Sequence, residues 1–196
     1  MPQRDIRFRH TAPSLRRRTV LLMAGTLIAA PVTRKPLHAA TATDAPVSLA
    51  EIAAHPPLVL PALSFTDADG TERDLASFRG QPAVLHFWAT WCGPCVTELP
   101  ALAALTPALA QDGIAVLPVA TDHLGPEKVL PFLGRLNLGG FRSFYDTRAA
   151  AVAALEEPAL PLTLFLNREA QEVARHSGPV RWGEPGAENS LKRLLT

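Results

Sequence analysis

The stretch that most constrains this chain is LHFWATWCGPCVTELP at residues 85–100. The apolar run that leads into it, residues 82–88, has the length and composition of a buried central strand. A helix is predicted to begin at Cys92, soon after this strand. The sequence Cys92-Gly93-Pro94-Cys95 is therefore placed at a strand-to-helix junction.

The two cysteines at this junction are typical of a redox centre. A thiol at a helix N-terminus lies beside free backbone N–H groups and the positive end of the helix dipole, and both favour the reactive thiolate. Cys95 follows Cys92 by three residues, so it lies about one turn away on the same helix face, within reach of a disulfide. The chain has only these two cysteines, which excludes a framework of structural disulfides. We therefore predict a dithiol/disulfide centre.

The remaining sequence alternates between predicted strands and helices. The expected elements, in order, are a strand at 58–65, a short returning arm at 71–73, a short helix at 74–78, the central strand at 82–88, a helix at 92–112, a strand at 114–121, a helix at 126–137, a short strand at 143–146, a short helix at 148–155, a hairpin of strands 162–167 and 171–176, and a helix at 187–195. This order predicts an α/β sandwich in which helices flank a central mixed sheet.

The first 42 residues are similar to an export signal. A basic region that ends in Arg16-Arg17-Arg18 precedes an apolar run at 20–32 and a small-residue stretch at 39–42. The sequence from Arg17 to Leu21 resembles a twin-arginine signal, although valine stands where phenylalanine is usual. We therefore expect export, with the mature domain in the periplasm. The alternative is an uncleaved N-terminal anchor that leaves the domain facing the periplasm.

The expected leader divides the chain into three parts. Cleavage is expected at Ala40-Thr41-Ala42, with Leu37-His38-Ala39 as the second candidate. Residues 43–57 then form a flexible lead-in, and residues 58–196 form the folded domain.

Removal of the leader changes the charge of the protein. Residues 1–42 hold eight of the 19 basic residues and one of the 18 acidic ones, so the remainder carries a net charge of −6. A mildly acidic domain gives no support for binding to nucleic acid or to an anionic membrane surface.

With these elements in place, the chain resembles the thioredoxin superfamily, and more closely the exported thioredoxin-like reductases of the TlpA/ResA type. The resemblance runs from about Leu58 to the C-terminus. It is strongest in three segments: Phe87 to Cys95 with Pro100 beyond it, Leu63 to Gly80, and Pro161 to Asn167. It implies a thioredoxin-like three-layer sandwich that needs no cofactor.

The resemblance also implies a role for each cysteine. Cys92 is the attacking thiol, which forms a mixed disulfide with a client protein, and Cys95 resolves that mixed disulfide. Pro161 is expected to be cis and to hold Leu160 beside the dithiol, where its backbone pairs with an extended client segment. Pro158 is the competing candidate for the cis proline. The expected client-facing surface also includes Trp91, Gly93 and Pro94.

Two further residues are candidates for acid–base work. Glu98 matches an acidic position that tunes the cysteine pKa values in ResA-type proteins; the alternative is an exposed glutamate favoured by the helix dipole. His86 stands where thioredoxins have a buried aspartate. A neutral imidazole there would accept the Cys95 proton, and a protonated one would stabilise a thiolate. The alternative is a core histidine bonded to a backbone carbonyl.

These features predict a thiol–disulfide oxidoreductase. Gly93-Pro94 between the cysteines is shared with cytoplasmic thioredoxin, whose potential is about −270 mV, and this favours a reductase of client disulfides. Cytochrome c maturation is a candidate process, with a membrane electron donor for re-reduction. The alternatives are an oxidase or isomerase of the same fold and, from another class, a metal-binding chaperone. We expect no metal, because a zinc site needs four ligands and the chain has one cysteine pair.

Overall fold

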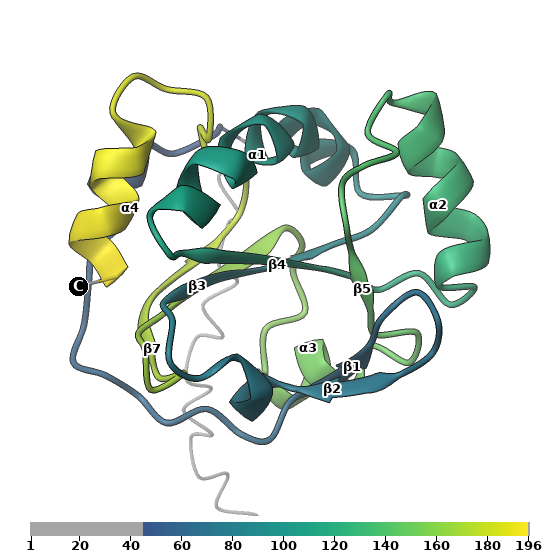
Figure 1. Cartoon of the computed structure of the whole chain (residues 1–196), viewed down its shortest axis with the longest axis horizontal. Helices are drawn as coiled ribbons and strands as arrows, with labels where there is room; N and C mark the ends of the chain where they lie inside the picture. The colour runs from purple at the N-terminus through teal and green to yellow at the C-terminus, as the bar shows by residue number, and fades with distance from the viewer. Residues whose placement is uncertain (1–44, 196) are drawn as a thin grey trace, which may run out of the picture. The chain divides into compact units, whose positions relative to one another are not determined.

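The computed structural model describes residues 45–195, so the predicted export signal lies outside the described residues. Figure 1 shows a twisted sheet with helices on both of its faces. The strands are β1 (Ser64–Thr66), β2 (Glu72–Asp74), β3 (Ala83–Trp88), β4 (Ala115–Ala120), β5 (Phe144–Tyr145), β6 (Leu162–Leu166) and β7 (Glu172–Ser177). The helices are α1 (Gly93–Gln111), α2 (Pro126–Arg135), α3 (Ala150–Ala154) and α4 (Ala187–Leu195), with 3₁₀ turns η1 (Leu49–Glu51) and η2 (Leu75–Phe78).

The sheet is mixed and has the order β2-β1-β5-β4-β3-β6-β7. β3 pairs in parallel with β4 and antiparallel with β6, and all six of its side chains are buried. A strand covered on both faces needs apolar side chains at successive positions, which explains the continuous run that predicted it. The exception within this run is His86.

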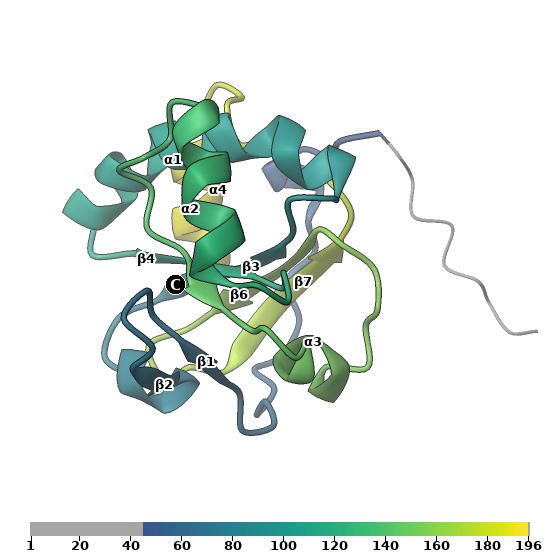
Figure 2. The same ribbon diagram turned by 90° about the vertical axis from the view of Figure 1, so that its right-hand side faces the viewer.

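The two faces of β3 contribute to different parts of the core. Leu85 and Phe87 pack with α3 and the β1–β2 side of the domain. Val84 packs with α4, and Trp88 packs with α1 and α2. Figure 2 shows α1, α2 and α4 on one side of the sheet and α3 on the other. His86 alternates with Val84 and Trp88 and so faces the side of α1, as expected from the period of two.

Capping residues, prolines and glycines in the local sequence mark where α1 and α2 begin and where α1 ends. α1 starts after Cys92 as its N-cap, with proline in the first turn, and the chain leaves it through Gly113 at φ 71°. α2 follows Gly125, at φ 50°, where an added Cβ would lie 2.9 Å from Thr147 Cγ2. A side chain at residue 125 would therefore be strained by the positive φ and would require the Thr147 side chain to shift.

Several expected boundaries differ from the observed ones. The strand expected at 58–65 is reduced to β1, because Leu58 instead forms an isolated bridge with Glu172 at the edge of β7. The helix expected at 126–137 ends at Arg135, and the one expected at 148–155 is only α3. The first residues of the hairpin and of the last helix agree with expectation to within one position.

The described part of the lead-in is hydrogen-bonded to the folded domain. Val47 N–H donates to the Pro179 carbonyl at 3.0 Å, and the Ser48 hydroxyl donates to Glu184 at 2.7 Å. Ser48 and Glu51 form a capping box on η1. Further along, the His55 N–H donates to the Val173 carbonyl at 2.8 Å and Leu58 bridges to Glu172, so this part of the chain covers the β7 edge, which would otherwise present unpaired backbone groups.

Candidate active site

The two cysteines form a disulfide at the start of α1. Cys92 is the N-cap residue, and the Cα atoms of Cys92 and Cys95 are 5.3 Å apart. The Cys95 backbone N–H points at Cys92 Sγ, with an N···S distance of 3.3 Å. When the disulfide is reduced, the same N–H group and the helix dipole stabilise a Cys92 thiolate.

The two sulfurs differ in access. Cys92 is 6% exposed, whereas Cys95 is 0% exposed. The residues around Cys92 are open to solvent: Trp91 is 67% exposed, and Gly93 and Pro94 are exposed as well. Of the two cysteines, Cys92 is therefore the one with access from solvent.

The cis proline lies in the chain segment before β6. The Leu160–Pro161 peptide bond is cis, and no other cis bond is present among residues 45–195. Leu160 is partly buried and packs against the cluster that contains Cys92, Cys95 and Trp88. The fold thus brings Leu160 and Pro161, distant in sequence, next to the disulfide. Pro158, the competing candidate, is not preceded by a cis bond.

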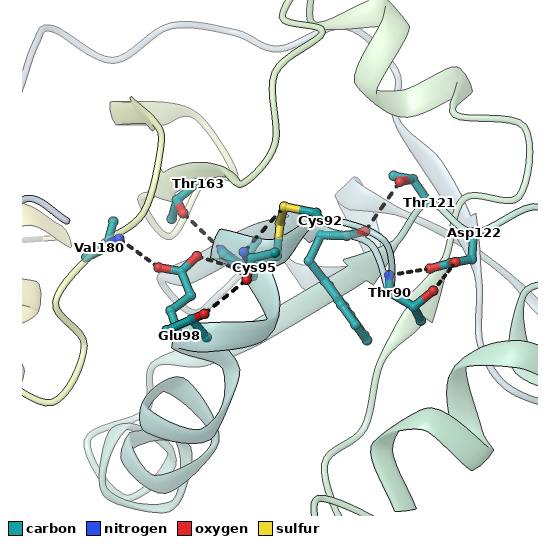
Figure 3. The surroundings of a disulfide bond; sticks show 12 residues. Thr90, Cys92, Cys95, Glu98, Thr121, Asp122, Thr163 and Val180 are labelled. Atoms are coloured by element: carbon teal, nitrogen blue, oxygen red, sulfur yellow. Dashed lines mark hydrogen bonds and ion pairs between the residues drawn. A yellow bond between two sulfur atoms is a disulfide. The ribbon is translucent and has the colours of Figure 1, made fainter. Parts of the chain in front are cut away.

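Glu98 lies one turn after Cys95 and is buried. One of its oxygens, Oε2, accepts from the Val180 backbone N–H at 2.7 Å and from Trp182 Nε1–H at 3.1 Å. Figure 3 shows its carboxylate directed towards Val180, on the opposite side of the disulfide from Asp122. Burial raises the pKa of Glu98 to about 7, although these two hydrogen bonds act in the other direction. Glu98 is therefore buried, and the alternative prediction of an exposed glutamate is wrong.

His86 faces Glu98 from β3. His86 is fully buried; Nδ1 lies 3.0 Å from Thr163 Oγ1, and Nε2 lies 3.5 Å from Glu98 Oε1. The latter two atoms have no hydrogen-bond partner among the described residues. Burial lowers the pKa of His86 to about 3. Both pKa shifts favour a neutral pair, in which a protonated carboxyl faces a neutral imidazole.

A third buried group at the site is absent from the sequence-based expectations. Asp122, just after β4, accepts from the Thr90 backbone N–H at 2.9 Å and from the Thr90 hydroxyl at 2.6 Å (Figure 3). Lys128 on α2 pairs with the same carboxylate at 2.8 Å. Burial alone would raise the pKa of Asp122, but the hydrogen bonds from Lys128 and Thr90 outweigh it and keep the pKa below its usual value. Asp122 therefore fixes the loop that presents Cys92.

Asp122→Ala is expected to lower the free energy of unfolding by about 2 kcal/mol at neutral pH, because it leaves the Thr90 donors and Lys128 without their acceptor. The pKa of Asp122 is lowered in the folded protein, so its contribution is present above the unfolded pKa of about 3.8 and is lost as the pH falls through the folded value. Urea unfolding at several pH values should show the gap between wild type and variant narrow in acid. An unfolding midpoint equal to that of the wild type at neutral pH would contradict this role.

Two negative findings apply to the described part of the chain. No helix within residues 45–195 is long and apolar enough to cross a membrane. In the same range, no group of three or more His, Cys, Asp or Glu side chains is placed to hold a metal ion.

Comparison with known proteins identifies the family. The family model described as Redoxin matches residues 40–191, most of the chain. The chain belongs to the Redoxin family. This redoxin is 31% identical over 113 residues to the thiol-disulfide oxidoreductase ResA of Geobacillus kaustophilus, a match that covers 57% of the chain and 63% of that relative. It is 28% identical over 108 residues to ResA of Bacillus subtilis, covering 55% of the chain and 59% of the relative. The matches thus span about three fifths of these relatives.

Solved structures confirm the thioredoxin-like sandwich expected for this redoxin. A secreted Mycobacterium tuberculosis disulfide oxidoreductase homologous to DsbE superposes with a TM-score of 0.55 at 23% identity, covering 67% of this chain and 95% of that one. An exposed lipoprotein thioredoxin of Streptococcus pneumoniae superposes with a TM-score of 0.56 at 21% identity, covering 68% of this chain and 99% of that one. At these identities the likeness establishes the fold alone.

Proposed function

We propose that this redoxin is a thiol–disulfide oxidoreductase that reduces disulfides of exported client proteins. The observation that carries the proposal is the asymmetry of the Cys92–Cys95 pair at the start of α1. The outer sulfur can be reached beside an exposed Trp91, and the inner one is sealed in the core. The partial matches to ResA proteins support the same activity.

The proposed reaction transfers two electrons in two steps. In the reduced protein, the Cys92 thiolate attacks a client disulfide, forms a mixed disulfide and releases one client thiolate. Cys95 then loses its proton and attacks Cys92 Sγ, which forms the intramolecular disulfide and releases the second client thiolate. The client gains two electrons and leaves as two thiolates, which take up protons from solvent; the protein gives up two electrons and the Cys95 proton. The backbone at Leu160, next to cis-Pro161, is the proposed pairing edge for the client segment.

The buried pair is proposed to handle the proton of the inner thiol. Cys95 is sealed from solvent and stands one turn from Glu98, so its proton needs an acceptor inside the protein. When Glu98 is ionised, the pair formed by its Oε1 and the facing His86 Nε2 can accept that one proton on either atom. His86 and Glu98 are therefore proposed as acid–base residues.

The direction of electron flow is proposed from the residues between the cysteines. Gly93-Pro94 matches cytoplasmic thioredoxin, a reductant of about −270 mV. A reductant in the periplasm needs an electron source, and we propose a membrane donor, with cytochrome c maturation as the candidate process. The periplasmic location is supported by the leader-like sequence of residues 1–42. The alternative is an oxidase or isomerase built on the same site.

The deciding experiment is the reduction potential of the Cys92/Cys95 couple, followed as thiol content in a dithiothreitol redox buffer. We expect a reversible two-electron couple near the value of thioredoxin. A value tens of millivolts higher would favour the oxidase or isomerase, because about 30 mV changes the equilibrium tenfold. The absence of any reversible couple would remove the oxidoreductase proposal.

A further inference from the structure

A row of polar side chains crosses three neighbouring strands beneath α1. His86 on β3 lies directly opposite Thr163 on β6, and Thr163 lies directly opposite His176 on β7. Residues opposite one another in antiparallel strands project from the same face, with Cβ atoms about 4.5–5.5 Å apart. The three side chains therefore stand side by side on the sheet face that carries Glu98 and Cys95 above it.

The row leads from the sealed core towards the surface. His86 and Thr163 are both 0% exposed and are joined by the 3.0 Å contact between Nδ1 and Oγ1. His176, at the edge of the sheet, is half-buried and hydrogen-bonds to the Pro179 carbonyl. Burial lowers the pKa of His176, and this hydrogen bond only partly opposes the effect. Its imidazole is therefore an acceptor near neutral pH.

Among residues 45–195, apolar groups lie against two other sides of His86, and the Glu98 side chain keeps 6% of its surface exposed. β4 presents Pro118 opposite His86, and the Trp182 ring closes against the imidazole edge-on at 5.9 Å between centroids. The titratable residues that the helix turn and the strand register place beside the pair are Cys95 on α1 and His176 on β7. Arg181, next to Trp182, is exposed and is engaged with Glu184 and the Pro46 carbonyl.

We propose that Thr163 and His176 form the proton exit of the site. The Cys95 proton reaches the His86–Glu98 pair and leaves through the Thr163 hydroxyl to His176 and solvent. The inference rests on the proposed function, because it is the resolution of the mixed disulfide that releases this proton.

The relay conserves protons and needs no further reactant. His86 Nδ1 exchanges a proton with the Thr163 hydroxyl, which acts as donor and acceptor at once. The two side chains are neighbours by strand register without a direct hydrogen bond, so the hydroxyl passes a proton to His176 through one water, and His176 returns it to solvent. The electron pair of Cys95 Sγ forms the bond to Cys92 Sγ, and the client thiolate leaves with the pair from the broken S–S bond.

The test isolates the second step of a single turnover. The reduced full chain is mixed in a stopped-flow instrument with dithiobis-nitrobenzoate, which releases one coloured thiolate on attack by Cys92 and a second on resolution by Cys95. The rate of the second phase is measured across pH for Thr163→Val, Thr163→Ser and His176→Asn. The matched controls are Thr106→Val, which removes a hydroxyl bonded within α1, and His123→Asn, which removes an exposed imidazole.

The expected pattern separates a relay from a packing effect. Thr163→Val should slow the second phase about tenfold, the scale of one weakened proton transfer, while Thr163→Ser stays near wild type. His176→Asn should slow it as well and should recover when imidazole is added, because the lost group lies at the surface. Imidazole should not rescue Thr163→Val, whose defect is buried. Both controls should match the wild type.

Two outcomes would overturn the inference. One is that Thr163→Val and His176→Asn both show a second phase with the rate and pH profile of the wild type. The other is an equal acceleration of all proteins by imidazole. Neither outcome contradicts the proposed function, which is tested separately by the reduction potential of the Cys92/Cys95 couple.

Discussion

Cys92→Ser is expected to abolish disulfide reduction, whereas Cys95→Ser is expected to keep the first step and stop at the mixed disulfide. The outer sulfur at the N-cap of α1 is the one that a client disulfide can reach, and a serine hydroxyl is not ionised at neutral pH. The inner sulfur is sealed beneath it. Cys95→Ser should therefore accumulate a covalent client complex that a reductant releases, visible by non-reducing electrophoresis and mass spectrometry.

The two cysteine variants control for each other. Both lack the disulfide, so a difference in client capture between them cannot come from the loss of that cross-link. The assignment would be reversed if Cys92→Ser captured the client and Cys95→Ser did not. A loss of capture in both variants would indicate that neither thiol acts alone as the nucleophile.

Glu98→Gln is expected to change how stability depends on pH. The pKa of Glu98 is about 7 in the folded protein, against 4.5 for the ordinary side chain. The folded protein therefore keeps a proton that the unfolded chain releases, and the stability of the wild type falls as pH rises from 4.5 to 7. The loss amounts to about 3 kcal/mol. Glutamine preserves an acceptor for Val180 and Trp182 but does not titrate.

The measurement is the difference in free energy of unfolding between Glu98→Gln and the oxidised wild type. We expect this difference to move by about 3 kcal/mol in favour of the variant between pH 4.5 and about pH 8. His86, whose folded pKa is about 3, destabilises the folded state as pH falls below 6.5 in both proteins, so its effect cancels. Glu169→Gln, at an exposed turn, is the matched control. A difference that does not vary with pH would contradict the buried carboxyl.

The parts of the fold predicted well are those fixed by local sequence. The run before Cys92 predicts β3 because a strand buried on both faces needs successive apolar residues. The boundaries of α1 follow from a thiol N-cap, a proline in the first turn and a glycine after the last. The cis bond at Pro161 was expected only through the resemblance, since the sequence itself left Pro158 as a competitor.

Other features depend on which strands become neighbours. The local sequence did not distinguish a buried Glu98 from an exposed one. Glu98 is buried because the fold brings Val180 and Trp182 over α1, where both donate hydrogen bonds to its carboxylate. In the sequence, Asp122 looks like an ordinary loop residue. It holds the Cys92 loop through its hydrogen bonds with Thr90 only because β3 and β4 end side by side.

By itself, the sequence determined the dithiol, the strand and helix that carry it, and the alternation that produces a mixed sheet. These follow from residue periods and from capping, which act over a few positions. The tertiary structure alone decided that His86, Thr163 and His176 stand in one row. The His86–Thr163 half of that row depends on the register between β3 and β6, which joins residues 77 positions apart and is set by how the core packs. The Thr163–His176 half belongs to the β6–β7 hairpin.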